Sequence, residues 1–158
     1  MTVCIVDTSI LCNVLRMPGR DQHYEQAIAE LEVHIEQRHR LLLPVTAILE
    51  AGNLIAQSGD GRQRRAVAER FIQQVRQAIE GQAPWTPTPA FELDRVLKYL
   101  DGFAEHAMRG VGFGDMAITY EFERQCQLNP GRRVFVWSYD DHLRAYDRPP
   151  TLSRSERE

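Results

Sequence analysis

The sequence has a single lysine, Lys98, and no excess of positive charge. Lys and Arg together number 19 against 22 Asp and Glu, which gives a formal net charge of −3 at pH 7. This balance excludes a protein that coats nucleic acid by bulk positive charge alone. Every other fixed cation is an arginine, the side chain best suited to bidentate phosphate contacts, although codon usage in the genome explains this bias at least as well.

Cysteines are also few, and their spacing is not that of a zinc site. Cys4, Cys12 and Cys126 are odd in number and lack the short paired spacing of zinc ligands, which favours reduced thiols in a cytoplasmic protein. No apolar run is long enough to span a bilayer and no basic segment followed by an apolar one opens the chain, so no membrane association is expected. The 158 residues, 43% of them hydrophobic, predict one soluble globular domain with a single core.

Short β-rich runs alternate with longer segments of helical periodicity. Strands are predicted at 3–6, 41–43, 85–86 and 134–137, and helices at 21–37, 46–57, 62–80 and 115–125, with two more beginning at Ile10 and at Thr88-Pro89. The cap of the helix at Ile10 is expected to be Thr8 or Ser9. The apolar face of the helix after Thr88-Pro89 is expected to include Phe91, Leu97 and Leu100.

This alternation predicts the fold class. Strands that alternate with helices are typical of an α/β fold, here a single three-layer α/β/α domain with a short, mostly parallel sheet flanked by helices. The domain is expected to cover residues 1–146, and the polar tail 147–158 is expected to be flexible. Trp85 and Trp137 are predicted in the core or the sheet, with stacking on a base or a partner as the alternative for Trp85.

Four carboxylates fall where this fold places ligands. Asp7 interrupts the apolar stretch CIVDTSILCNVL (4–15), which contains no Lys, Arg or His to pair with it, so its partner must come from elsewhere. Asp7 and Asp140 each follow a predicted strand, while Glu50 and Asp115 lie near the starts of predicted helices. Ligands of open α/β sheets bind at the carboxyl ends of the strands, and we expect all four carboxylates to converge there.

Converging carboxylates repel one another unless a cation lies between them. Mg²⁺ or Mn²⁺ would suit such a site, because hard divalent ions take oxygen ligands and retain several waters. The hydroxyls of Thr8 and Ser9 would then orient the carboxylates or a water.

Each acid taken alone also suits an ordinary structural role. Asp7 suits a helix cap, Glu50 an ion pair with an exposed Arg, Asp115 the first turn of a helix and Asp140 a turn. Glu50 is the hardest to explain in this way, because it lies among apolar residues with Thr46 and Asn53 one turn before and after it. That arrangement predicts a polar stripe in an otherwise buried setting, in which Thr46 and Asn53 would orient the Glu50 carboxylate or a water.

Four segments resemble, in order, the acidic motifs of the PIN-domain ribonucleases. They are VCIVDTSIL at the start of the chain, TAILEAGN (46–53), GFGDMAI (112–118) and VFVWSYDDHL (134–143). Within this family the chain is most similar to the VapC-type toxins of prokaryotic toxin–antitoxin pairs, which are single PIN domains. The resemblance extends from residue 3 to about residue 146.

The resemblance implies a PIN-like fold and an endoribonuclease that hydrolyses RNA phosphodiester bonds with Mg²⁺ or Mn²⁺. It places the metal-binding acids on Asp7, Glu50, Asp115 and Asp140, and the supporting hydroxyl on Ser9 or Thr8. It also implies a homodimer and inhibition by a cognate antitoxin protein.

The last motif departs from the family pattern. Ser138 replaces the usual Thr, His142 occupies the place of a second acid, and Asp141 lies between that place and Asp140. Either Asp140 alone or Asp140 with Asp141 would complete the site, and Ser138 and Asp141 are predicted to orient water. Arg109, before the glycine-rich loop, is the predicted RNA phosphate contact.

Two other functions are weighed against the nuclease. A phosphatase of the haloacid dehalogenase type also places an Asp after its first strand, but it needs an acid where Ser9 stands and a Lys such as Lys98 at the phosphoryl group. A PIN fold that binds RNA or a protein without cutting is the other alternative, and His142 favours it. The remaining histidines, interpreted as surface or boundary residues, are His23, His34, His39 and His106.

Overall fold

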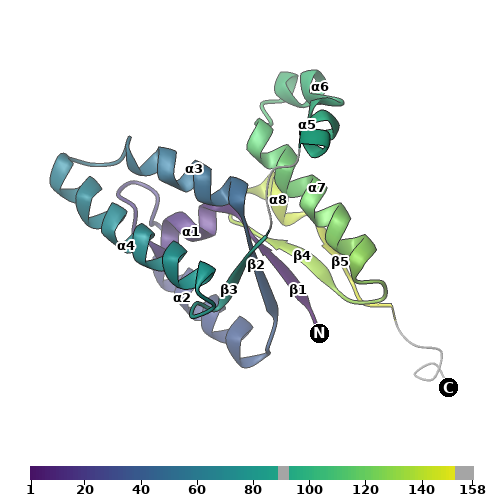
Figure 1. Ribbon diagram of the computed structural model, residues 1–158, viewed down its shortest axis with the longest axis horizontal. Coiled ribbons are helices and arrows are strands. Elements are labelled where there is room, and N and C mark those ends of the chain that lie inside the picture. The colour runs from purple at the N-terminus through teal and green to yellow at the C-terminus, as the bar shows by residue number, and fades with distance from the viewer. Residues whose placement is uncertain (89–92, 152–158) are drawn as a thin grey trace.

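The computed structural model describes residues 1–88 and 93–151 (Figure 1). The strands are β1 (Val3–Val6), β2 (Arg40–Pro44), β3 (Trp85–Thr88), β4 (Val134–Trp137) and β5 (Asp147–Arg148). The helices are α1 (Thr8–Val14), α2 (Tyr24–Glu36), α3 (Val45–Ile55), α4 (Gly61–Ile79), α5 (Leu93–Leu100), α6 (Phe103–Met108), α7 (Phe113–Leu128) and α8 (Asp141–Arg144).

The strands form one sheet in the order β3-β2-β1-β4-β5. β1 lies at its centre, where Val3 pairs with Arg40 of β2 and with Val134 of β4. These neighbours and β3 run parallel, and only β5 is antiparallel. The predicted α/β fold with a short, mostly parallel sheet is therefore confirmed.

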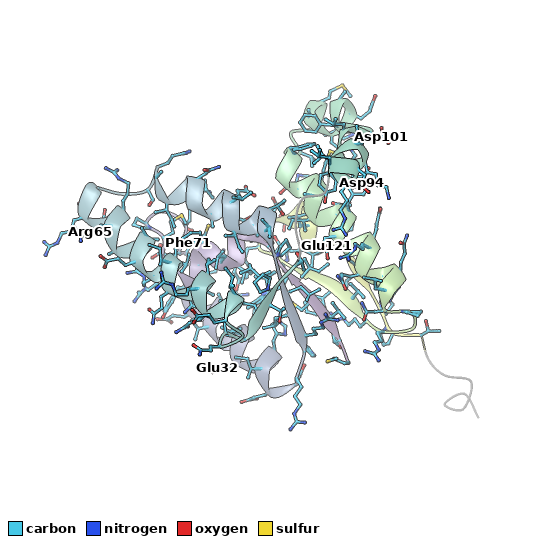
Figure 2. The ribbon with its side chains drawn as sticks, viewed as in Figure 1. Glu32, Arg65, Phe71, Asp94, Asp101 and Glu121 are labelled. Atoms are coloured by element: carbon cyan, nitrogen blue, oxygen red, sulfur yellow. The ribbon has the colours of Figure 1, made fainter. Side chains whose placement is uncertain are left out.

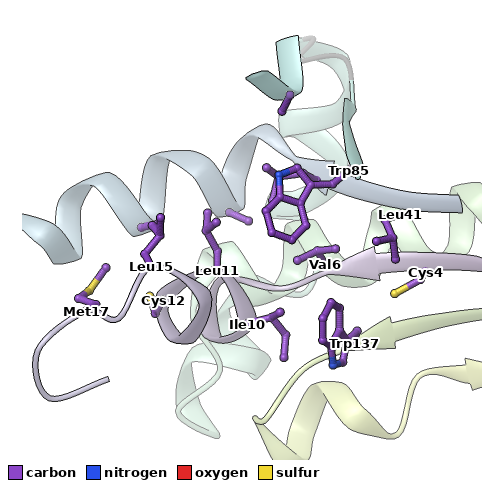
Figure 3. Close-up of a cluster of buried hydrophobic side chains, with 14 of the residues drawn as sticks. Cys4, Val6, Ile10, Leu11, Cys12, Leu15, Met17, Leu41, Trp85 and Trp137 are labelled. Atoms are coloured by element: carbon purple, nitrogen blue, oxygen red, sulfur yellow. The ribbon is translucent and has the colours of Figure 1, made fainter. Parts of the chain in front are cut away.

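The alternation of side chains along β1 creates two apolar layers. Cys4 and Val6 face α1, α3 and α4, whereas Val3 and Ile5 face α7 and α8. Figure 3 shows the rings of Trp85 and Trp137 on either side of Val6, and both rings are buried, as predicted for the core. Helices cover both faces of the sheet, which gives the three layers (Figure 1).

The segment between β3 and α7 differs from its prediction. Two short helices, α5 and α6, replace the expected single helix, because Gly102 takes a left-handed conformation with φ +75°. Leu97 and Leu100, predicted on the apolar face of this helix, are 65% and 55% exposed, so that face is not buried at these positions. The pair stands away from the sheet (Figure 1) and packs on the start of α7 through aromatic contacts such as Tyr99 with Phe113. The predicted helix start at Pro89 and the apolar residue Phe91 lie outside the described residues.

Two boundaries also need correction. Helix α1 begins at Thr8, not at Ile10, because Asp7 is its N-cap and accepts a hydrogen bond from the Ser9 amide. The tail is not free from residue 147 onward: β5 pairs with β4, and the Arg148 guanidinium donates to the carbonyls of Cys126, Asn129 and Arg132.

No helix within 1–88 and 93–151 has both the length and the apolar character needed to cross a membrane. The longest, α4, instead carries arginines along its outer side, and Figure 2 shows Arg65 projecting away from the sheet.

Candidate active site

A cavity of about 370 Å³ opens at the carboxyl end of the central strands, and the four predicted carboxylates line it. Asp7 follows β1 directly and Asp140 lies shortly after β4, while Glu50 comes from α3 and Asp115 from the first turn of α7. Parallel strands deliver their carboxyl ends to one edge, which explains how residues so far apart in the sequence reach one cavity.

Asp7 is only 4% exposed, and hydroxyl groups rather than a cation satisfy it. Its Oδ2 accepts hydrogen bonds from Ser138 Oγ (2.8 Å), Ser9 Oγ (2.9 Å) and the Ser9 amide (3.3 Å). All three reach the same oxygen, so Oδ1 is left for a ligand. The Ser9 hydroxyl also accepts from the Tyr139 amide at 3.0 Å and thereby ties the end of β4 to the start of α1.

Glu50 lies on the exposed side of α3, which contradicts the buried setting expected from its apolar neighbours. Thr8 Oγ1 donates to Glu50 Oε2 at 3.0 Å and holds the carboxylate over the cavity. Gly114, in the first turn of α7, leaves the space for this approach, because a Cβ there would lie 3.0 Å from the same oxygen. The N-terminus of α7 also favours the negative charge.

Asp115 has a clearly raised pKa in this cavity. Burial, reinforced by the charges of Asp7, Asp140 and Glu50, raises the pKa of Asp115 from 3.8 to about 6. A divalent cation in the cavity would offset the negative charges that act on Asp115.

Asp140 and Asp141 are separated by the structure. Asp140 lines the cavity and caps α8, with its Oδ1 accepting from the His142 amide at 2.9 Å. The Asp141 side chain is 96% exposed, lies 3.6 Å from Arg144 and does not line the cavity. Ser138 is buried, and its hydroxyl reaches Asp7 rather than solvent.

Three other predicted site residues lie apart from the cavity. Thr46 and Asn53 share a helix with Glu50, but the wall that α3 contributes consists of Glu50 and Leu54. Arg109 is exposed at the end of α6, on the segment that stands away from the sheet.

Sequence reasoning missed Arg20, His23 and Tyr139, which also line the cavity. Arg20 and His23 belong to the loop between α1 and α2, and the local sequence pattern does not show that this loop turns back to the sheet edge. Asn13 offered a signal, because a polar residue in an apolar helix needs partners: its side chain accepts from the His23 amide at 2.8 Å. Tyr139 lies between Ser138 and Asp140, but no spacing in the sequence distinguishes it as a site residue.

The chemistry of the donor set fits Mg²⁺ or Mn²⁺, since every candidate ligand is a carboxylate oxygen. Across the described parts of the chain, however, no group of three or more His, Cys, Asp or Glu side chains is arranged to hold a metal ion as it stands. Mg²⁺ needs only one or two direct carboxylates, so this spacing does not conflict with the ion.

No model of a known protein family matches the chain, and no curated protein matches it. The cavity and its residues are therefore the basis for assigning a function.

Proposed function

We propose that the chain is a divalent-metal-dependent endoribonuclease with a PIN-like site, acting as the toxin of a VapBC-type toxin–antitoxin pair. One observation carries the enzymatic part: four carboxylates from four separate segments line one cavity, where burial and the charges of the other three raise the pKa of Asp115 to about 6. A fold gains nothing in stability from gathering like charges in this way, whereas a site for a divalent ion and a phosphodiester requires it.

The four carboxylates have different proposed roles, which follow from their positions in the cavity. Asp7, Glu50 and Asp115 would hold Mg²⁺ or Mn²⁺, and Asp140 would hold a second ion or orient the attacking water. A bound ion would supply positive charge that acidifies a water and neutralises the phosphate. Ser9 and Ser138 fix the Asp7 carboxylate, and Thr8 fixes that of Glu50, so that their free oxygens face the substrate.

The toxin assignment rests on the resemblance of the four motifs to VapC-type proteins. It predicts a cytoplasmic homodimer that a cognate antitoxin protein inhibits. A gene directly upstream that encodes a small DNA-binding protein, and whose product relieves growth arrest caused by this chain, would support it.

Cleavage of total RNA by the purified protein tests the enzymatic proposal. We expect discrete fragments with Mg²⁺ or Mn²⁺, none in EDTA, and none from Asp7→Asn or Asp115→Asn. The Asp7→Asn change is a fair test because Asn caps helices about as well as Asp, so α1 is preserved. Folded, antitoxin-free protein that gives no metal-dependent fragments would rule out the nuclease.

A catalytically weak PIN fold that binds RNA or protein is the second candidate. Two observations favour it: Asp140 is engaged as a helix cap, and the described carboxylates are not arranged as a ready ion site. Titration with Mn²⁺ separates the two, because a binding module would show no thermal shift that Asp7→Asn abolishes. The phosphatase alternative loses its lysine, since Lys98 lines a different pocket, beside Tyr99 and Tyr120.

A further inference from the structure

The wall of the cavity contributed by the loop after α1 and by Tyr139 differs in chemistry from the carboxylates. Arg20, His23 and Tyr139 supply a cation and two aromatic rings to a cavity that otherwise gathers negative charge. The nuclease mechanism uses none of the three, so each needs its own explanation.

The loop that carries Arg20 and His23 is built into the fold. Asn13, 4% exposed, accepts from the His23 amide at 2.8 Å and donates from Nδ2 to the Ser9 carbonyl at 2.8 Å. Met17 is fully buried, and its carbonyl accepts from the Arg20 amide at 2.9 Å. The backbone of this loop therefore holds Arg20 and His23 at the rim without help from a ligand.

The Arg20 guanidinium is not used by the protein itself. Within 1–88 and 93–151 it makes no side-chain hydrogen bond and no ion pair within 4.0 Å, although four carboxylates line the same cavity. Other arginines near the fold's core do have internal partners: Arg70 donates to the Leu15 carbonyl and Arg133 pairs with Asp147. An unengaged guanidinium beside a proposed phosphodiester site suits a phosphate oxygen.

The two rings form a fixed aromatic surface next to it. The His23 and Tyr139 centroids lie 4.7 Å apart with an interplanar angle of 38°. The Tyr139 hydroxyl donates to Glu30 Oε2 at 3.2 Å, and Trp137 Nε1 donates to the same oxygen. The hydrogen bond to Glu30, whose carboxylate Trp137 also holds, fixes the position of the Tyr139 ring.

We infer that Arg20 binds a substrate phosphate beside the scissile bond and that the His23–Tyr139 pair stacks on one unpaired base of the bound RNA. This inference rests on the proposed nuclease function. An unpaired base can leave its neighbours and lie on an aromatic ring, whereas duplex RNA keeps its bases inside the helix and is read by shape. The inference makes Arg20 and the His23–Tyr139 pair substrate-binding groups, in addition to the four carboxylates.

Binding of a short, labelled, unstructured oligoribonucleotide, followed by fluorescence anisotropy in Mn²⁺ on the Asp115→Asn background, tests this inference. Arg20→Gln should weaken binding and lower the slope of log K against log[salt] by about 0.7, the contribution of one phosphate contact to single-stranded binding. Arg40→Gln, which removes an exposed charge at the opposite end of the sheet, should leave the slope unchanged. Arg20 has no internal partner to lose, so its variant should melt like the parent.

The ring pair has its own controls. His23→Ala and Tyr139→Ala should each weaken binding about fivefold or more, in the range of one base-stacking contact. Tyr139→Phe keeps the ring and should bind like the parent. A duplex of the same sequence should compete poorly.

The outcomes separate the inference from the function on which it rests. Metal-dependent cleavage by the wild type with unchanged affinity and salt slope in Arg20→Gln would overturn the inference and leave the nuclease standing, as would an equal loss in Arg40→Gln. Equal binding of duplex would overturn the stacking role. Arg20-dependent binding without any cleavage would keep the inference and remove the nuclease, and a wild type that neither binds nor cuts RNA would remove both.

Discussion

The two ends of the central sheet handle charge in opposite ways. At the amino end, Arg133 donates to both carboxylate oxygens of Asp147 (3.0 and 2.7 Å), and the Nδ1 atoms of His34 and His39 lie 3.0 Å apart, within hydrogen-bond distance. At the carboxyl end, four carboxylates share one cavity, and the side-chain hydrogen bonds that the Asp7 and Glu50 carboxylates accept there come from neutral hydroxyl groups. Charges that satisfy one another serve the fold, whereas like charges held together are available to a ligand.

The largest effect expected from this contrast is on catalysis. A catalytic metal contributes several kcal/mol of charge stabilisation, so Asp140→Asn should lower the rate of RNA cleavage by about 10²- to 10³-fold. Asn retains the cap of α8, so stability should hold. Asp141→Asn is the matched control and should stay within about twofold of the wild type, since that carboxylate lies outside the cavity. Equal losses in the two variants would mean that the cavity does not define the site.

Metal binding at the carboxyl end of the sheet should raise the free energy of unfolding of the protein. At a free Mn²⁺ concentration about 100 times the Kd, linkage predicts about 2.7 kcal/mol of added unfolding free energy. For a chain of this size that is a rise in Tm of about 5–10 °C. Differential scanning fluorimetry with and without EDTA measures this rise, which Asp7→Asn should abolish. A rise that survives in Asp7→Asn would place the ion elsewhere.

The hydroxyl that holds Asp7 should matter less than the acids themselves. Groups that orient metal ligands are worth about 10- to 100-fold in metal affinity or activity. Ser138→Ala removes the 2.8 Å hydrogen bond to Asp7 Oδ2 and should cause a loss in that range. Ser138→Thr keeps the hydroxyl and should recover most of the activity, as measured by cleavage at saturating Mn²⁺. Full activity in Ser138→Ala would show that Asp7 needs no such support.

The sequence was most informative about the carboxyl end, for a physical reason. β1 and β4 are short apolar runs whose ends are marked by polar residues, and parallel pairing carries Asp7 and Asp140 to one edge. The helix-start positions of Glu50 and Asp115 then point to the same place. Local patterns were therefore sufficient to find the four acids.

Local patterns failed where tertiary contacts decide exposure. The apolar neighbours of Glu50 suggested burial, yet Leu49 is 55% exposed, because α3 has more apolar residues than its one packed face can cover. The helical spacing of Leu97 and Leu100 likewise suggested a packed face, but both side chains are exposed. Arg20 reaches the cavity on a loop that is held by Asn13 and by the buried Met17. The hydrophobic periodicity of the sequence does not predict these contacts.

The cost of gathering like charges should be measurable without metal. The folded-state pKa of Asp115, about 6, exceeds its ordinary value of 3.8, so folding takes up a proton between these pH values and stability falls as pH rises through that window. In EDTA, Asp115→Asn should therefore be more stable than the wild type at pH 8, by about 1 kcal/mol after solvent screening, and equal to it near pH 4. Urea unfolding at the two pH values tests this. A variant less stable than the wild type at pH 8 would mean that the carboxylates do not repel.

At the amino end of the sheet, acid should lower the free energy of unfolding, which is the opposite of its effect through Asp115. This is the smallest of the expected effects. Burial lowers the pKa values of His34 and His39 below 6.5, and for His34 the nearby His39 lowers it further. Their contribution to stability is thus complete above pH 6.5 and is lost as pH falls through the folded-state values, because two protonated rings cannot share the 3.0 Å hydrogen bond. His39→Gln should flatten this loss by less than about 1 kcal/mol, since His39 is near the surface. His106→Gln, on α6, is the control for removing a histidine elsewhere. If His39→Gln leaves the acid limb of the unfolding profile unchanged, the pair does not titrate with folding, and the contrast between the two ends rests on the carboxylates alone.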